Sequence, residues 1–245
     1  MKDVRAIVCD VYRTILQVGA APENSQQRWE ILYRSALCRA PQLSLEEVAL
    51  NCREIISEDH REARGRGINY PEVNWPSVMK RALPQLDALS QPHLDAFLFN
   101  HAQLFRSLSV MPGCVTVFRE CLKRGILLGI ASNAQAYTLT EVEATLREAG
   151  LNSSIFQADL TFWSFEHGFS KPDPHVFEIL RARLRNRCLS ISQALVIGDR
   201  EDKDIAPARA AGWRTWRVSD DQSGGHQGSW HSLAQALFDL DIMSS

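Results

Sequence analysis

The sequence lacks the features that would point to a membrane or to nucleic acid. Its longest apolar runs have the length of a strand and fall far short of the roughly 20 residues that cross a bilayer. No basic block occurs, and 27 lysines and arginines against 29 acidic residues give a net charge of −2. That balance argues against nucleic acid or an anionic membrane as the main partner. Internal repeats and low-complexity tracts are also absent.

Disulfide and zinc-type cysteine spacings are missing as well. Six cysteines are scattered along the chain without a CxxC pair. At this chain length we expect them to be reduced, mostly buried thiols of a cytoplasmic protein. With 245 residues, 45% of them hydrophobic, the chain can bury one large core or two smaller ones.

A short apolar segment that ends in a polar turn occurs four times. The segments are 6–9 before Asp10, 126–131 before Ser132-Asn133, 194–197 before Gly198-Asp199, and 215–218 before Ser219. Helical patterns lie at 115–123, 137–149, 174–185 and 205–211. Strands that alternate with helices predict an α/β fold with a Rossmann-like, doubly wound parallel sheet.

The stretch from about Pro22 to Phe105 is different, because it contains helical patterns and no convincing strand. We expect four helices there, at 24–40, 44–64, 75–88 and 92–106, with Pro84 ending or kinking the third. The organisation predicts a Rossmann-like core of residues 1–17 and 110–245 and an inserted helical domain of residues 18–109. We expect the hinges at 17–21 and 107–113.

Four polar groups occur in one order along the chain. They are Asp10 with Thr14, Ser132-Asn133, Lys171 before Pro172-Asp173-Pro174, and Gly198-Asp199 with Asp204. Each alone has an ordinary structural explanation, such as a helix cap or a turn. Together they resemble the four motifs of the haloacid dehalogenase superfamily. The helical stretch lies where that superfamily inserts its helical (C1-type) cap domain.

The resemblance implies a hydrolase with Asp10 as the nucleophile. A carboxylate can attack phosphorus or an activated carbon, and the covalent intermediate divides one difficult substitution into two easier ones. Because a phosphoryl substrate is anionic, a Mg²⁺ ion with oxygen ligands would offset the repulsion from the carboxylate. By resemblance its ligands are the Asp10 carboxylate, the backbone carbonyl of Tyr12, Asp199 and Asp204.

The resemblance also assigns roles to the remaining motif residues. Ser132, Asn133 and Lys171 are expected to bind the oxygens of the transferred group, since a hydroxyl, backbone N–H groups and an ammonium suit developing negative charge. Lys171 is also expected to keep Asp10 and Asp199 from forming an uncompensated anionic cluster. Thr14 is expected to support the loop by hydrogen bonding.

Two residues of the first motif depart from the phosphatases of the superfamily. Tyr12 occupies the position of their general acid/base, and tyrosine, with an ordinary pKa of about 10, is a poor base at neutral pH. Arg13 stands where a glycine is usual, and its guanidinium either pairs with a substrate anion or folds onto a surface carboxylate. The 2-haloacid dehalogenases also carry tyrosine at the position of Tyr12, but they use no metal and lack the acid that is Asp199 here.

Three hypotheses therefore stay open. The first is a Mg²⁺-dependent phosphohydrolase for a small phosphorylated metabolite. The second is dehalogenase-like hydrolysis at carbon, with Arg34 or Arg39 binding a substrate carboxylate. The third is a member of the superfamily that binds a metabolite without turnover. In each case we expect a small anionic ligand, no nucleic acid or membrane partner, and a monomer or homodimer.

Overall fold

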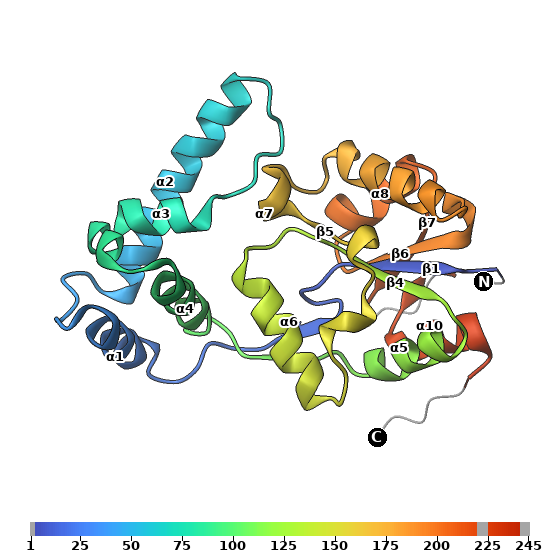
Figure 1. Ribbon diagram of the computed structural model, residues 1–245, viewed down its shortest axis with the longest axis horizontal. Helices are drawn as coiled ribbons and strands as arrows, with labels where there is room; N and C mark the ends of the chain where they lie inside the picture. The colour runs from blue at the N-terminus through green and yellow to red at the C-terminus, as the bar shows by residue number, and fades with distance from the viewer. Residues whose placement is uncertain (1–2, 220–224, 241–245) are drawn as a thin grey trace.

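A parallel sheet lies at the centre of the larger part of the molecule (Figure 1). The computed structural model describes residues 3–219 and 225–240, and within them six strands follow the order β5-β4-β1-β6-β7-β8. All neighbouring pairs are parallel. The strands are β1 (Ala6–Cys9), β4 (Leu127–Ser132), β5 (Phe162–Trp163), β6 (Ala194–Gly198), β7 (Arg214–Val218) and β8 (Gln227–Gly228). The predicted doubly wound α/β fold is confirmed.

Helices cover both faces of this sheet, with α8 on one side and α5 and α10 on the other (Figure 1). The predicted helices of this part agree with the structure to within a residue or two. A π-helical turn that the sequence did not predict, Glu201–Ile205, leads directly into α9. The helices of this part are α5 (Cys114–Lys123), α6 (Tyr137–Glu148), α7 (Ser164–His167), α8 (Pro174–Asn186), α9 (Ala206–Ala210) and α10 (Trp230–Phe238).

The central strand β1 is buried on both faces, which explains its apolar sequence. Ile7 and Cys9 belong to the apolar cluster that includes Phe118 of α5. Ala6 and Val8 belong to the cluster that includes Phe177 of α8. Since successive side chains of a strand point to opposite faces, the apolar run anchors the strand from both sides and presents the next residue at the sheet edge.

A pair of short antiparallel strands joins the sheet to the helical insert. β2 (Leu16–Val18) pairs with β3 (Leu108–Val110), so the chain enters and leaves the insert side by side. The predicted hinges at 17–21 and 107–113 are thus partly strand, which the sequence did not predict. Each strand has three residues, too few to give an alternating pattern above the background.

The helical insert consists of α1 (Ser25–Leu37), α2 (Leu45–Gly65), α3 (Trp75–Ala82), a 3₁₀ turn (Pro84–Ala88) and α4 (Gln91–Ala102). It has its own apolar cluster, which includes Trp29, Tyr33 and Phe97. As predicted, the third helix ends just before Pro84, which begins the 3₁₀ turn. The fourth helix ends at Ala102, earlier than the predicted residue 106. Among the described helices, none combines the length and apolar character that crossing a bilayer requires.

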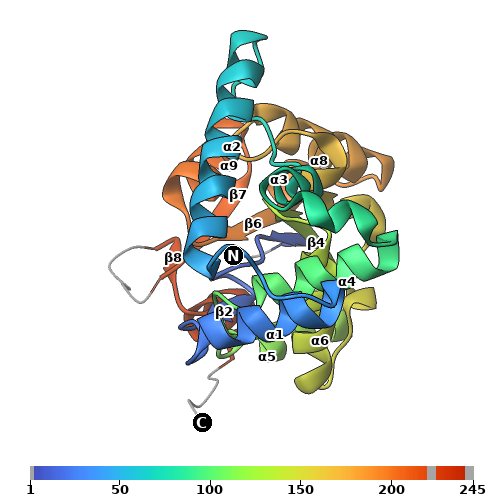
Figure 2. The same ribbon diagram turned by 90° about the vertical axis from the view of Figure 1, so that its left-hand side faces the viewer.

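The insert lies over the carboxyl ends of the strands, and Figure 2 views it from that side. Its loop after α2 contacts the sheet part through main-chain hydrogen bonds. The Glu72 amide donates to the Gly168 carbonyl at 3.0 Å, and the Ser170 amide donates to the Tyr70 carbonyl at 2.9 Å. Gln135, which follows β4, donates to the Glu72 carboxylate at 3.0 Å. The insert is therefore docked directly beside the segment that leads to Lys171.

His101 is a buried histidine inside the insert. It is 2% exposed, and its ring lies among the rings of Trp29, Phe97 and Phe105, with centroids 5.7, 6.3 and 5.2 Å away. Neither ring nitrogen has a hydrogen-bond partner among the described residues. Burial lowers the pKa of His101 to about 4 from its ordinary 6.5.

This burial makes the stability of the fold depend on pH. Below pH 6.5 His101 is protonated in the unfolded chain but remains neutral in the folded chain. The free energy of unfolding therefore decreases as the pH falls from 6.5 toward 4. We expect His101→Phe to abolish a loss of about 2 kcal/mol between pH 7 and pH 5, measured by urea unfolding at both values. His101→Gln, which cannot titrate, should remove the same loss. An unchanged pH dependence in both variants would contradict the assignment.

Candidate active site

The carboxyl ends of three strands bring the predicted site residues together. Asp10 follows β1, Ser132 ends β4 and Asp199 follows β6. Because parallel strands end at the same edge, these side chains meet at the switch point of the sheet. Asp10 and Asp199 line a pocket of about 320 Å³ together with Asp204 and basic side chains, whereas Ser132 is fully buried and is not among the lining residues.

Gly198 allows Asp204 to reach this pocket from the turn after β6. A Cβ added at Gly198 would lie 2.4 Å from the Cβ and 2.5 Å from the Cγ of Asp204. Any larger residue would push that carboxylate away from the strand end. This close approach gives a physical reason for the Gly-Asp pair at the end of β6.

Lys171 holds two of the carboxylates together. Its Nζ donates to Oδ1 of Asp10 at 2.8 Å and to Oδ1 of Asp204, and the residue is 4% exposed. Burial alone would lower the pKa of Lys171, but the two adjacent carboxylates outweigh it and raise the pKa. The ammonium therefore stays charged, and its two carboxylate partners are Asp10 and Asp204, where the sequence analysis expected Asp10 and Asp199.

Asp10, Asp199 and Asp204 form an acidic cluster that can hold a divalent metal. One oxygen from each carboxylate lies within 4.8 Å of the others. Burial raises the pKa of Asp10 to about 6, helped by repulsion from Asp204 and Asp199 and opposed by Lys171. Burial and Asp204 also raise the pKa of Asp199. Oxygen-only donors whose mutual repulsion a cation would relieve fit Mg²⁺.

Ser132 and Asn133 have different surroundings. The Ser132 hydroxyl is buried and has no hydrogen-bond partner in the described part of the chain. The Asn133 side chain is engaged at both ends by the backbone of Lys171. Its Oδ1 accepts from the Lys171 amide at 2.7 Å, and its Nδ2 donates to the Lys171 carbonyl at 2.9 Å. Asn133 thus fixes the backbone of Lys171.

The backbone of Thr14 supports the loop that carries Asp10 and Tyr12. Its hydroxyl is buried and makes no hydrogen bond to a described residue. Its carbonyl accepts from the indole N–H of Trp230 at 2.7 Å. The amides of Ile15 and Leu16 donate to the Val11 carbonyl, each at 2.8 Å. The loop that carries Asp10 is therefore closed on itself and tied to α10.

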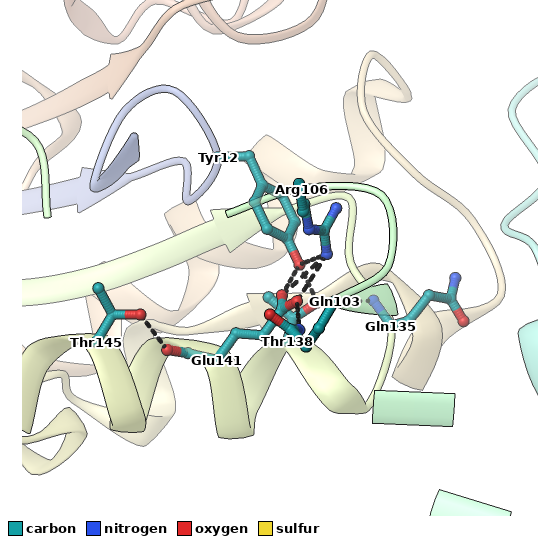
Figure 3. Close-up of polar contacts among 7 residues, drawn as sticks. All are labelled: Tyr12, Gln103, Arg106, Gln135, Thr138, Glu141 and Thr145. Atoms are coloured by element: carbon teal, nitrogen blue, oxygen red, sulfur yellow. Dashed lines mark hydrogen bonds and ion pairs between the residues drawn. The ribbon is translucent and has the colours of Figure 1, made fainter. Parts of the chain in front are cut away.

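The Tyr12 hydroxyl is bonded to helix α6 (Figure 3). It donates to the Glu141 carboxylate and lies 2.8 Å from the Thr138 hydroxyl. It also accepts from Arg106 at 3.0 Å, and the Arg106 guanidinium lies 4.4 Å from the centre of the tyrosine ring. Burial and the neighbouring Glu141 raise the pKa of Tyr12, against the opposing charge of Arg106. A phenol in this environment keeps its proton and cannot act as a base.

Glu141 and Arg106 are site residues that the sequence did not suggest. Glu141 is 2% exposed and accepts from Arg106 at 2.9 and 3.0 Å and from Gln103 at 2.7 Å. Arg106 follows α4, so the cluster joins the chain leaving the insert to the loop that carries Asp10 and Tyr12 (Figure 3). The sequence contained one clue to the role of Glu141. This glutamate lies on the same buried face of α6 as Thr138, Val142 and Thr145, where a charged residue needs a partner.

A family model of haloacid dehalogenase-like hydrolases matches residues 4–212. The chain belongs to this family. A curated relative, the ribulose-1,5-bisphosphate 5-phosphatase of Halopiger xanaduensis, is 32% identical over 128 residues. That match covers 52% of this chain and 47% of the relative, about half of the relative's length. The family predicted from the four motifs is thus confirmed, and the protein is a hydrolase of that family.

Solved structures of the family share the fold. A 2-haloacid dehalogenase from Pseudomonas syringae pv. Tomato DC3000 has a TM-score of 0.60 at 19% identity, with 95% of this chain and 97% of that one covered. A HAD phosphatase from Thermococcus onnurineus has a TM-score of 0.55 at 17% identity, with 98% and 100% covered. At these identities the likeness concerns the fold alone.

Arg13 is the second departure of this haloacid dehalogenase-like hydrolase from the phosphatase motif. It adopts the left-handed backbone conformation, with a φ of 58°, where a glycine is unstrained. Its exposed side chain lines both the pocket at Asp10 and a neighbouring cleft of about 570 Å³ beside the β2–β3 strand pair. Arg34 and Arg39, by contrast, are exposed and line neither.

The strain at Arg13 leads to a stability test. We expect Arg13→Gly to raise the free energy of unfolding by about 0.5–1 kcal/mol. The left-handed conformation costs a non-glycine residue about 1–2 kcal/mol, and the greater conformational entropy of glycine in the unfolded chain offsets part of the gain. Urea unfolding of both proteins measures the difference. Arg13→Lys, which keeps a side chain in the same conformation, should show no gain. A glycine variant less stable than the parent would contradict this account.

Proposed function

We propose that the protein is a Mg²⁺-dependent phosphohydrolase that acts on a small, anionic phosphorylated metabolite through an aspartyl-phosphate at Asp10. The observation that carries the proposal is the acidic cluster of Asp10, Asp199 and Asp204. Within this cluster, Asp199 gives the strongest support for a metal-dependent phosphohydrolase, because the metal-free dehalogenases that the first motif resembles lack this acid. The curated relative named as a phosphatase supports the same assignment.

Asp10 performs the substitution at phosphorus. Its Oδ1 is held by Lys171, while Oδ2 makes no hydrogen bond to a described residue and supplies the attacking electron pair. The new bond joins Oδ2 to phosphorus as the bond to the leaving oxygen breaks, and that oxygen keeps the electron pair. Water then attacks the phosphorus, which restores the carboxylate and releases phosphate.

The surrounding residues bind and orient the phosphoryl group. The free Ser132 hydroxyl donates to a phosphoryl oxygen, and the Lys171 ammonium supplies positive charge beside it. Asp10, Asp199, Asp204 and the Tyr12 carbonyl would hold Mg²⁺, which neutralises negative charge on the phosphoryl oxygens when bound. Asn133 acts indirectly, by fixing the backbone of Lys171.

The helical insert serves as the cap in this proposal. Residues 18–109 form the cap domain and residues 1–17 and 110–245 the hydrolase core, of which 1–2, 220–224 and 241–245 lie outside the described residues. The separate apolar cluster of the insert and the antiparallel β2–β3 junction support this division. A cap over the strand ends would exclude water from the reacting phosphoryl group.

Hydrolysis at carbon is the second candidate, because Tyr12 matches the dehalogenases. The exposed positions of Arg34 and Arg39, away from the pocket, weigh against the carboxylate-binding role that this hypothesis gave them. Release of halide from a 2-haloacid without added metal would establish it. The third hypothesis, a family member that binds a metabolite without turnover, is compatible with the family match, and the absence of turnover with every substrate tested would favour it.

The first test is hydrolysis of 4-nitrophenyl phosphate with Mg²⁺ and with EDTA. We expect turnover with Mg²⁺, none with EDTA, and a loss of roughly 10³-fold or more in Asp10→Asn, which stays folded. Asp202→Asn is the matched control, because Asp202 is an exposed acid that pairs with Arg200 outside the acidic cluster. Full turnover in Asp10→Asn, or equal turnover with EDTA, would refute the proposal.

A further inference from the structure

The Tyr12 hydroxyl donates its proton in a hydrogen bond to a neighbouring side chain, Glu141. The hydroxyl donates to the Glu141 carboxylate, whose side chain is 1% exposed, and its acceptor side faces Arg106 at 3.0 Å. Figure 3 shows the hydroxyl, the guanidinium and the carboxylate turned toward one another. The residue at the position of the phosphatase general acid therefore serves a structural bond in this chain.

Releasing that proton to a substrate would disturb a buried ion pair. Glu141 is held by Tyr12, Arg106 and Gln103 together, and a buried carboxylate that loses donors is strongly disfavoured. The cluster also includes three separate elements: the catalytic loop, α6 and the segment after α4. Rotating Tyr12 toward the pocket would break contacts to two of them.

Three basic side chains of the pocket offer positive charge to a leaving oxygen. Arg13, Arg200 and Lys203 line it beside the acidic cluster. An arginine keeps its proton under all ordinary conditions but stabilises an anion strongly. Lys171 is bound to two carboxylates, and the Asn133 amide is bound to the backbone of Lys171. This lining suits a leaving group that departs as an anion.

We infer that the site selects phosphorylated substrates whose leaving oxygen forms a stable anion, namely acyl, enol or aryl phosphates and phosphoanhydrides, over phosphate esters of simple alcohols. The inference rests on the proposed phosphohydrolase function. In the first step the bond from Asp10 to phosphorus forms and the bond to the leaving oxygen breaks. The electron pair stays on that oxygen, which leaves unprotonated and takes a proton from water only after departure.

The test is the dependence of kcat/KM on the acidity of the leaving group. Ring-substituted phenyl phosphates of similar size, with phosphate release as the readout and Mg²⁺ present, vary the leaving group while the transferred group stays constant. Since kcat/KM reports the step in which the leaving group departs, later hydrolysis of the aspartyl-phosphate does not affect it. Tyr12→Phe, which removes only the hydroxyl, is measured beside the parent over the same series.

We expect kcat/KM to fall by about 10²- to 10⁴-fold from the most to the least acidic phenol, the factor that general acid catalysis would otherwise recover. The same dependence in Tyr12→Phe supports the inference. A shallow dependence in the parent overturns it, whether or not the variant folds, because some group then donates a proton. A dependence that becomes steeper in Tyr12→Phe identifies Tyr12 as the donor and also overturns it. Absence of turnover with every member of the series refutes the phosphohydrolase function itself.

Discussion

The site depends on the buried ammonium of Lys171 between Asp10 and Asp204. Three carboxylates converge at one edge of the sheet, and without a cation they would repel one another or take up protons. Removing one partner of such a buried pair costs about 3–5 kcal/mol. Asn133, which follows β4, bonds to both the amide and the carbonyl of Lys171. The end of β4 therefore positions the ammonium that holds Asp10 and Asp204 together.

The loop that carries Asp10 is held from three directions. Its own backbone closes on the Val11 carbonyl, α10 reaches the Thr14 carbonyl through Trp230, and α6 holds Tyr12 through Glu141. Arg106 adds the chain leaving the helical insert to the same cluster. The substitution of tyrosine in the first motif is therefore accompanied by partners from distant parts of the sequence.

The sequence predicted those parts of the fold in which local pattern and burial agree. β1, β4, β6 and β7 are apolar runs buried in the sheet, and each was expected within one or two residues. β5 and β8 have two residues each and give no pattern, so they escaped prediction, as did β2 and β3. The fourth insert helix was predicted too long because its apolar pattern continues past Ala102, while the chain turns away.

The candidate site divides in the same way. Asp10, Asp199 and Lys171 belong to local motifs and could be named from their neighbours in the sequence. Glu141 and Arg106 could not be identified in this way, because their role depends on a contact with Tyr12, which lies more than 90 residues away in the sequence from each of them. The hydrogen bonds that join both ends of the Asn133 side chain to the backbone of Lys171 are likewise tertiary contacts that no motif contains.

The main-chain contact between the insert and the sheet part has a consequence for solvent access. The Ser170 and Glu72 amides bond across the junction, and Ser170 directly precedes Lys171. Lifting the insert at this point must free both amides beside the buried ammonium. Their rates of hydrogen–deuterium exchange therefore report how often the charged centre meets bulk water. The exchange of these two amides therefore measures the fraction of time in which the insert is lifted and Lys171 is exposed to solvent.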